Sequence, residues 1–211
     1  MLVDALGLKD YALVWELQRR LVERRRRREI PDTLLLCEHL PVYTRGVSSK
    51  AAVPPFLPYP LHTVERGGDL TYHGPGQLVG YPILDLAAHG IGPRAYLRTL
   101  ETVLASALIP LGLECTALRG FTGLWCRGKK VASLGVAVKD RVSYHGFALN
   151  VNCDLAPFRA IYPCNLQPDQ MATLQGLLGR PLDAAQLAPQ VADAFLRRFS
   201  PSAAALSSIS S

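Results

Sequence analysis

The sequence predicts one α+β domain in which a mixed β-sheet carries helices on one face. Helical patterns occur near both ends of the chain and once in between, whereas most of the middle consists of short apolar runs typical of strands. The chain has 211 residues, of which 49% are hydrophobic and 19% charged, so it can bury a substantial core as a single unit. We expect this domain to cover residues 1–200 and the Ser/Ala-rich residues 201–211 to form a disordered tail.

Three segments have the apolar periodicity of amphipathic helices: residues 10–28, 94–111 and 184–199. In the first segment, Asp10 is a suitable N-cap. Leucine then recurs every fourth residue, at Leu13, Leu17 and Leu21, and Val14 and Trp15 widen this apolar stripe, which predicts the buried face of the helix. The five arginines Arg24–Arg28 close the helix and hold much of the net charge of +6. We interpret them mainly as a solvated helix end, where cations suit the helix dipole, with docking of an acidic partner as the alternative.

The predicted strands are residues 33–37, 62–65, 78–86, 123–126, 130–138 and 143–151. Pro82 indicates that its strand lies at an edge or contains a bulge. The spacing of the last two strands predicts a hairpin with its turn at residues 139–141. Residues 53–60 contain four prolines and are expected to form a loop.

The five cysteines are widely spaced and form no CxxC pair. This disfavours a disulfide framework and a structural zinc site, so we expect no metal. The sequence shows no charged-then-apolar leader and no apolar run approaching the roughly 18 residues of a membrane span. We expect a cytoplasmic protein that does not bind membranes, and nothing in the sequence demands more than a monomer.

The segment RGGDLTYHGPGQ, residues 66–77, has too many glycines for a helix or an ordinary central strand. No Gly-Lys-Ser/Thr follows it, and it is not a GxGxxG motif opening a helix, so phosphate binding is unsupported. Glycine content alone would also fit a tight connection between strands. However, Arg66, Tyr72 and His73 are interleaved with the glycines. Polar groups beside exposed backbone N–H groups suit a ligand with carbonyl or amide groups, so we interpret this segment as a substrate-binding loop.

Cys164 is the candidate nucleophile. It lies in IYPCNLQPDQ, a segment with the composition of a loop, where a thiol can be exposed and aimed. Most cysteines are small buried hydrophobic residues, and Cys37 in its apolar strand is expected to be one. A thiolate needs a nearby cation, and Lys129, Lys130 and His145 are the candidates. Neighbouring strand residues face opposite sides, so only one of the two lysines can face the site, and the pattern does not decide which.

Several segments, taken together, resemble the octanoyltransferase (lipoyl transferase) family. These are RGGDLTYHGPGQ with the following LVGYPILDL, and IPDTLLLCEHLPVYTRG, GKKVASLGVAV, SYHGFALNVN and YPCNL, in the order of the family. The resemblance spans roughly residues 10–178 and implies the catalytic fold shared by biotin and lipoate protein ligases. It also implies octanoyl transfer from acyl carrier protein to a lysine of lipoyl domains, with no cofactor. This is the first step of endogenous protein lipoylation.

The resemblance assigns the catalytic roles position by position. Cys164 falls on the nucleophile that forms the thioester acyl-enzyme, and Lys130 falls on the lysine that lowers the cysteine pKa. Asn165 stands where the family usually has glycine, and asparagine enters the left-handed backbone region readily. The residues that fall on the acyl-pocket segments, where glycine and alanine would leave room for an eight-carbon chain, are Arg66, Gly67, Gly68, Asp69, Leu70, Thr71, Tyr72, His73, Ser133, Leu134, Gly135, Gly146, Phe147 and Ala148.

The implied partners are acyl carrier protein, the lipoyl domains of 2-oxoacid dehydrogenase complexes and the glycine cleavage H protein. Three alternatives remain at this point. An ATP-dependent lipoate-protein ligase on the same fold would not need Cys164, and a thiol hydrolase would pair Cys164 with His145. A basic RNA-binding module is disfavoured because the arginine run contains no interleaved aromatic residues, so we expect no nucleic-acid partner.

Overall fold

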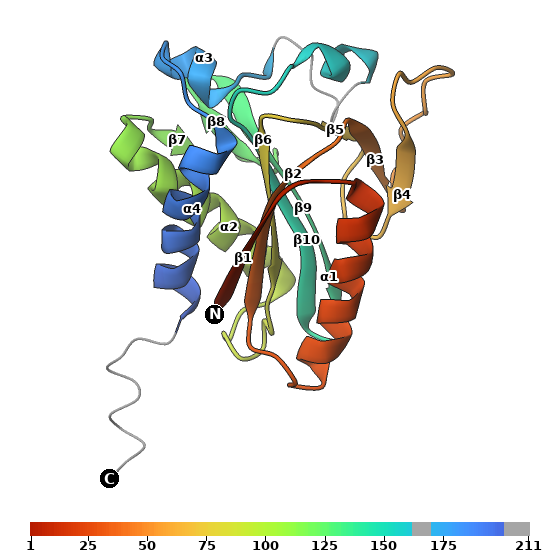
Figure 1. Cartoon of the computed structure of the whole chain (residues 1–211), viewed down its shortest axis with the longest axis vertical. Coiled ribbons are helices and arrows are strands. Elements are labelled where there is room, and N and C mark those ends of the chain that lie inside the picture. Colours follow the sequence, from red (N-terminus) through yellow and green to blue (C-terminus); the bar gives the residue numbers. More distant parts are fainter. Residues whose placement is uncertain (162–169, 201–211) are drawn as a thin grey trace.

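A mixed β-sheet forms the centre of the computed structural model, which describes residues 1–161 and 170–200 (Figure 1). Within these residues the main sheet has seven strands in the order β1-β2-β6-β10-β9-β8-β7. β1 and β2 are parallel and the other neighbours antiparallel, which confirms the mixed sheet. The strands in spatial order are β1 (Leu2–Lys9), β2 (Thr33–His39), β6 (Gln77–Ile83), β10 (Val142–Asn150), β9 (Lys129–Lys139), β8 (Leu124–Cys126) and β7 (Cys115–Thr116). The sequence pattern does not predict strand β1.

A second, three-stranded sheet supports the glycine-rich loop. Its strands, in spatial order, are β4 (Leu61–Val64), β3 (Val42–Gly46) and β5 (Thr71–His73). β5 lies inside the segment that the sequence predicts to be a loop, and it pairs antiparallel with β3. The first half of the loop, residues 66–70, therefore connects two strands of this small sheet.

Helices cover both faces of the main sheet, so the expectation of helices on one face is wrong. β2 shows the reason, because its side chains alternate between two cores. Leu35 packs with Val14 of α1 on one face, whereas Leu36 and Phe195 of α4 belong to the larger core on the other face. Figure 1 shows α1 on one side of the sheet and α2 with α4 on the other. The helices are α1 (Tyr11–Arg26), α2 (Pro93–Leu108), α3 (Leu174–Leu178) and α4 (Ala184–Phe199), with short 3-10 turns η1 (Ile109–Leu111) and η2 (Ala156–Ala160).

The buried face of α1 matches the predicted apolar stripe only in part: Val14 is buried and Leu17 and Leu21 are half-buried against the core. Asp10 is the N-cap, as predicted, and its carboxylate accepts the N–H of Ala12 at 2.8 Å. Leu13, however, is 67% exposed. The residues of α1 that are buried are Tyr11, Val14, Gln18 and Val22. The reason is Gln18, whose side-chain oxygen accepts the backbone N–H of His145 at 2.9 Å. A polar residue in the buried stripe conceals that stripe from a hydrophobicity pattern.

β6 lies between β2 and β10 and its pairing with both shows no register shift, so the prediction of an edge strand or a bulge at Pro82 is wrong. The proline is tolerated because pairing with β10 runs only from Gln77 to Gly80 and Pro82 lies beyond it. The Ser143 hydroxyl replaces part of the missing ladder, donating to the carbonyl of Pro82 at 2.8 Å and accepting the N–H of Leu84 at 3.1 Å. The side chain thus joins the strands where backbone pairing stops.

The predicted β9–β10 hairpin is confirmed. Lys139 pairs with Val142, and the two residues between them, Asp140 and Arg141, have φ values of 46° and 73°. Two consecutive positive φ values are the geometry of the tight turn that matches the twist of a β-hairpin. The hairpin fixes the register of β9 against β10, and both strands line the pocket described below.

Most arginines of the run Arg24–Arg28 form ion pairs with carboxylates of this chain. Arg25 donates to Asp32 at 2.7 Å, and both side chains are mostly buried. Arg27 and Glu29 are 2.6 Å apart in a more exposed pair. These contacts favour a role for Arg24–Arg28 in fixing the turn after α1.

Candidate functional site

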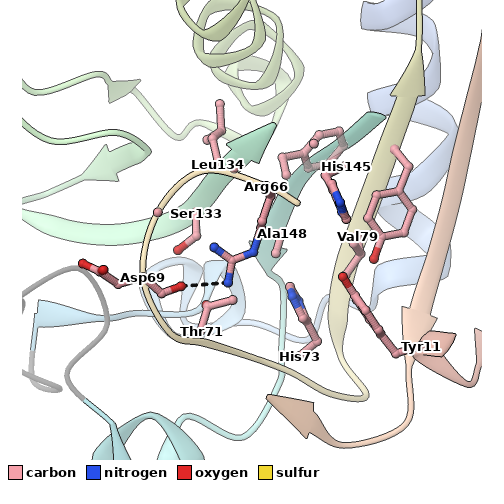
Figure 2. A pocket seen from close by; sticks show the side chains of 15 residues that line it. Tyr11, Arg66, Asp69, Thr71, His73, Val79, Ser133, Leu134, His145 and Ala148 are labelled. Atoms are coloured by element: carbon pink, nitrogen blue, oxygen red, sulfur yellow. Dashed lines mark hydrogen bonds between the residues drawn. The ribbon is translucent and has the colours of Figure 1, made fainter. Parts of the chain in front are cut away.

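A pocket lies where the glycine-rich loop crosses β9 and β10 (Figure 2). This central pocket holds about 490 Å³ of space between atoms when the open solvent at its mouth is included. Its lining residues are Tyr11, Arg66, Gly68, Asp69, Thr71, His73, Val79, Tyr81, Ser133, Leu134, Gly135, His145, Gly146, Phe147 and Ala148. The three predicted segments therefore meet at one site. Gly67 lines the adjoining cavity instead.

Leu70 and Tyr72 are the predicted residues that the structure does not bring to either cavity. Side chains of an extended segment alternate, so Thr71 and His73 face the pocket while their neighbours face away. Leu70 and Tyr72 are 2% and 3% exposed and pack in a separate small core with Phe158. Their contribution is to anchor the loop.

Sequence reasoning missed Tyr11, Val79 and Tyr81 as lining residues. Tyr11 comes from the start of α1, and the other two come from β6. No local signal marks them, because Tyr11 reaches the pocket through the packing of α1 on the sheet, and Val79 and Tyr81 reach it through the position of β6 beside β10. Figure 2 shows Tyr11 and His73 on the same side of the pocket.

Arg66 holds the glycine-rich loop in shape. The residue is only 8% exposed. Its Nη2 donates to the carbonyl oxygens of Thr44 and Asp69, each at 2.8 Å, and its Nη1 donates to the carbonyl of Gly67 at 2.9 Å (Figure 2 shows the bond to Asp69). A planar guanidinium is suited to several acceptors at fixed angles. The loop backbone is thus fixed by one side chain at the base of the pocket.

Two glycines of the pocket wall allow segments to pack closely. A Cβ at Gly135 would lie 2.9 Å from both Arg66 Cδ and the carbonyl oxygen of Gly67. A Cβ at Gly146 would overlap the carbonyl oxygen of Gly80. The space beside these glycines is therefore filled by protein, and the explanation that they leave room for a chain is wrong for both. They permit the loop and β6 to approach the hairpin closely.

His73 is a neutral, fully bonded residue. Its Nδ1 lies 2.8 Å from Gln77 Oε1, and Gln77 Nε2 donates to Asn150 Oδ1 at 2.9 Å. Gln77 therefore presents its oxygen to His73, which places the proton on Nδ1. Nε2 is 3.2 Å from the hydroxyl of Thr44. Burial lowers the pKa of His73 to about 3, so it positions the pocket wall and does not exchange protons near neutral pH.

His145 combines a strained backbone with burial. It has a φ of 53°, which is uncommon outside glycine, and it is 1% exposed. Its Nε2 lies 3.3 Å from Glu65 Oε2. Burial lowers the pKa of His145, whereas its hydrogen bond lowers the pKa of Glu65 to about 2. His145 pairs with Val136, six residues along β9 from Lys130 and hence roughly 20 Å away along the strand, so it is not beside that lysine.

Lys130 lies in a second cavity beside the central pocket, here called the lysine cavity. The two cavities share Gly68, Asp69, Leu134 and Gly135 as walls. Lys130 is 2% exposed, whereas Lys129 is half-buried and does not line either cavity. The backbone of Lys130 pairs with Trp125 on one side, and its carbonyl accepts the N–H of Ala172 at 3.0 Å on the other.

Cys164 lies outside the described residues. Ile161 before that segment and Met171 after it belong to the same small core, and Met171 forms a β-bridge with Lys130. The cysteines within the described ranges are Cys37, Cys115, Cys126 and Cys153, and all are buried and free. The buried position predicted for Cys37 is confirmed. Burial raises the pKa of Cys37 and of Cys153 to about 12, which makes both poor nucleophiles.

Within residues 1–161 and 170–200, no group of three or more His, Cys, Asp or Glu side chains is arranged to hold a metal ion. No helix in the same ranges combines the length and apolar character needed to cross a membrane.

Comparison with known proteins gives consistent matches over most of the chain. The family model described as lipoyl protein ligase A/B catalytic domain matches residues 10–196. A protein of Gloeobacter violaceus named octanoyltransferase is 45% identical over 196 residues, which cover 92% of this chain and 87% of that protein. One from Pelobacter propionicus with the same name is 40% identical and covers 98% of this chain and 100% of its own length.

Solved structures agree in fold at low sequence identity. A lipoate-protein ligase A crystallised with ATP superposes with a TM-score of 0.72 at 14% identity, covering 93% of this chain and 84% of that one. The biotin protein ligase of Aquifex aeolicus gives a TM-score of 0.55 at 14% identity, covering 94% and 68%. The predicted ligase-like α+β fold is thereby confirmed.

Proposed function

This chain belongs to the lipoyl protein ligase A/B catalytic-domain family and is an acyltransferase of its octanoyltransferase branch, and we propose that it transfers an octanoyl group from acyl carrier protein to a lysine of lipoyl domains. The observation that carries the proposal is the 40–47% identity to proteins named octanoyltransferase over most of both lengths. The solved ligases share the fold at 11–15% identity, which does not extend their ATP-dependent chemistry to this chain.

The central pocket suits the acyl chain. Val79, Leu134, Phe147 and Ala148 supply apolar walls. Arg66 and His73, two of its polar lining side chains, are already bonded to protein groups, whereas Thr71 Oγ1 and His145 Nδ1 are buried without a hydrogen-bond partner among the described residues. A saturated chain makes no hydrogen bonds, so it displaces water from beside Arg66 and His73 without breaking the bonds that hold these two side chains.

The reaction has two balanced steps. The thiolate of Cys164 attacks the thioester carbonyl, a new carbon–sulfur bond forms, and the carrier's thiolate leaves and takes up a proton. The lysine amine of the lipoyl domain then attacks the enzyme thioester, an amide bond forms, and Cys164 leaves as thiolate while the amine loses a proton. Thioester exchange is nearly thermoneutral and amide formation is downhill, so the reaction needs no ATP.

As an ammonium, Lys130 stabilises the Cys164 thiolate and then gives a proton to the leaving carrier thiolate; the neutral amine that results accepts the proton of the incoming lysine amine in the second step. Three observations support this pairing. Lys130 lines a cavity that adjoins the central pocket, and its backbone is bonded to the segment that resumes at Met171. Only two residues lie between Ile161 and Cys164, so chain length limits the separation of their Cα atoms to roughly 11 Å. A lowering of the thiol pKa by about two units corresponds to about 2.7 kcal/mol, which one nearby ammonium can supply.

The proposed acceptors are the lipoyl domains of 2-oxoacid dehydrogenase complexes and the glycine cleavage H protein. The same proposal gives a monomeric, cytoplasmic enzyme that requires no cofactor. Each of these statements is tested by assaying the purified chain with one acceptor at a time and by measuring its mass in solution.

The direct test is the mass of the intact protein after incubation with octanoyl-acyl carrier protein. Wild type should gain one octanoyl group and lose it to hydroxylamine, which cleaves thioesters. Cys164→Ala should gain none, while Cys153→Ala, which removes a buried thiol, should still be acylated. Acylation of Cys164→Ala to the wild-type extent would rule out the proposed nucleophile.

A further inference from the structure

A third hollow adjoins the lysine cavity and lies beside α2. The lysine cavity encloses about 970 Å³ including its open side, and this surface hollow encloses about 880 Å³ on the same basis. Both are lined by Leu97, Gly120, Phe121 and Thr122. The surface hollow is lined in addition by Arg94 and Arg98. The three hollows thus adjoin one another through shared lining residues, and the line from the two arginines, past Lys130, to the central pocket is here called the path.

Arg98 is held over the surface hollow by a buried carboxylate. Its Nη1 donates to Glu101 Oε2 at 2.9 Å, and the Glu101 side chain is 4% exposed while that of Arg98 is 61% exposed. The guanidinium is thus anchored at one end and open to solvent over most of its surface. Arg94 lies one helical turn earlier on the same helix and is exposed. Fixed cations lose less conformational freedom when they bind an anion.

The same carboxylate connects the arginine to the lysine cavity. Glu101 Oε1 accepts the backbone N–H of Gly123 at 3.1 Å. Gly123 has a φ of 137°, and a Cβ there would lie 2.7 Å from Lys130 Cε. Glu101 therefore fixes both the cation at the outer end of the path and the loop that packs on the lysine.

The rim of the hollow is also apolar in part. Phe121, which lines the hollow, is 45% exposed, and Leu118, whose carbonyl accepts the N–H of Phe121, is 39% exposed, although both are large hydrophobic residues. Exposed aromatic and aliphatic side chains next to arginines are typical of surfaces that bind proteins.

We propose that this face docks the acyl donor, an acidic carrier protein whose thioester is attached to a long arm through a phosphodiester. Arg94 and Arg98 bind the phosphate, the arm lies in the lysine cavity, and the acyl chain enters the central pocket. This inference rests on the proposed function. The order of groups along the path, two cations, then Lys130, then the apolar pocket, matches the order phosphate, thioester, acyl chain along the donor. A lysine acceptor carries no phosphate, so it does not account for the arginines.

The test uses two small donors that differ only in the phosphate, S-octanoyl-4′-phosphopantetheine and S-octanoyl-pantetheine. Arg94→Ala and Arg98→Gln should each raise the KM for the phosphorylated donor and for octanoyl-acyl carrier protein by about five- to tenfold, as expected for loss of a charge-assisted bond. Neither should change the KM for the donor without phosphate. Arg20→Ala, which removes the same charge from α1 on the other face of the sheet, should leave all three values unchanged.

Two further measurements separate docking from other effects. The rate at which a lipoyl domain removes octanoate from the preformed acyl-enzyme should be the same in the arginine variants as in wild type, because the donor has left by then. Arg94→Ala leaves the Glu101 pair intact, and thermal unfolding of both variants checks that they are folded.

If the variants changed the KM for both small donors equally, or changed neither KM, the docking proposal would be overturned. Acylation of the wild type would still support the proposed function in that case. Competition by ATP that is lost in the same variants would assign the hollow to a nucleotide and also overturn the proposal. No acylation of wild type by any donor would instead contradict the proposed function itself.

Discussion

Gly135 offers a sharp test of how the pocket wall is built. Its substitution by alanine places a Cβ 2.9 Å from the carbonyl oxygen of Gly67, well inside van der Waals contact, and that oxygen belongs to backbone held by Arg66. Overpacking of this kind costs about 1–3 kcal/mol. If the loop moves away instead, the bond from Gly67 N–H to the Val136 carbonyl, 3.0 Å long, is lost, which costs about 0.5–1.5 kcal/mol.

The matched control is Gly67→Ala on the facing segment, where the nearest atom to a new Cβ is the Val136 carbonyl oxygen at 3.9 Å. Thermal unfolding should show a loss of about 2–10 °C for Gly135→Ala, because 1 kcal/mol corresponds to about 2–4 °C in a domain of this size. Gly67→Ala should remain within about 2 °C of wild type. Equal stability of the two variants would refute the view that close packing, rather than pocket volume, requires glycine at position 135.

Three further predictions concern charge and protonation. Arg66→Lys should raise the KM for the acyl donor and lower the free energy of unfolding by about 1–3 kcal/mol. The reason is that an ammonium cannot bond the carbonyls of Thr44 and Asp69 together in the geometry of the guanidinium. Unchanged kinetics in that variant would contradict the role of Arg66 in shaping the loop. Burial lowers the pKa of His39 from 6.5 to about 4, so the unfolded chain binds more protons between these values and stability falls as the pH drops from 6.5 to 4. His39→Gln should flatten urea-measured stability against pH in that window by up to about 1.4 kcal/mol per pH unit, and an unaltered slope would show that His39 is already charged in the folded state. The Lys130→Ala variant should become acylated much more slowly at pH 7, and its rate should recover partly towards pH 9, where an unassisted thiol ionises. The control variant Lys129→Ala should become acylated at the normal rate. Identical pH profiles for the two variants would remove Lys130 from the mechanism.

The sequence predicted those features of the fold that depend on local chemistry. Asp10 as a helix cap and the tight turn at Asp140–Arg141 follow from interactions within a few residues, and both are confirmed. The buried stripe of α1 depends instead on a distant partner, because Gln18 is buried only to bond the backbone of His145. No periodicity within the helix contains that information.

The candidate site shows the same division. Thr71 and His73 were found through their motif and line the pocket, whereas Leu70 and Tyr72, from the same motif, alternate away into a separate core. Tyr11 reaches the pocket because α1 packs on the face of the sheet that the sequence left uncovered. Side chains contributed by tertiary packing carry no local signal, so these contacts required the three-dimensional arrangement.

The most direct measurement of the central claim is a single turnover with isolated acyl-enzyme. Enzyme acylated from octanoyl-acyl carrier protein is separated from the donor and mixed with a lipoyl domain in the absence of ATP, and the masses of both proteins are followed. The octanoyl group should leave the enzyme and reach one lysine of the lipoyl domain in equal amount. Release of free octanoate without lysine modification, or transfer only when ATP and free octanoate are supplied, would contradict a cysteine-bound intermediate passed between two proteins.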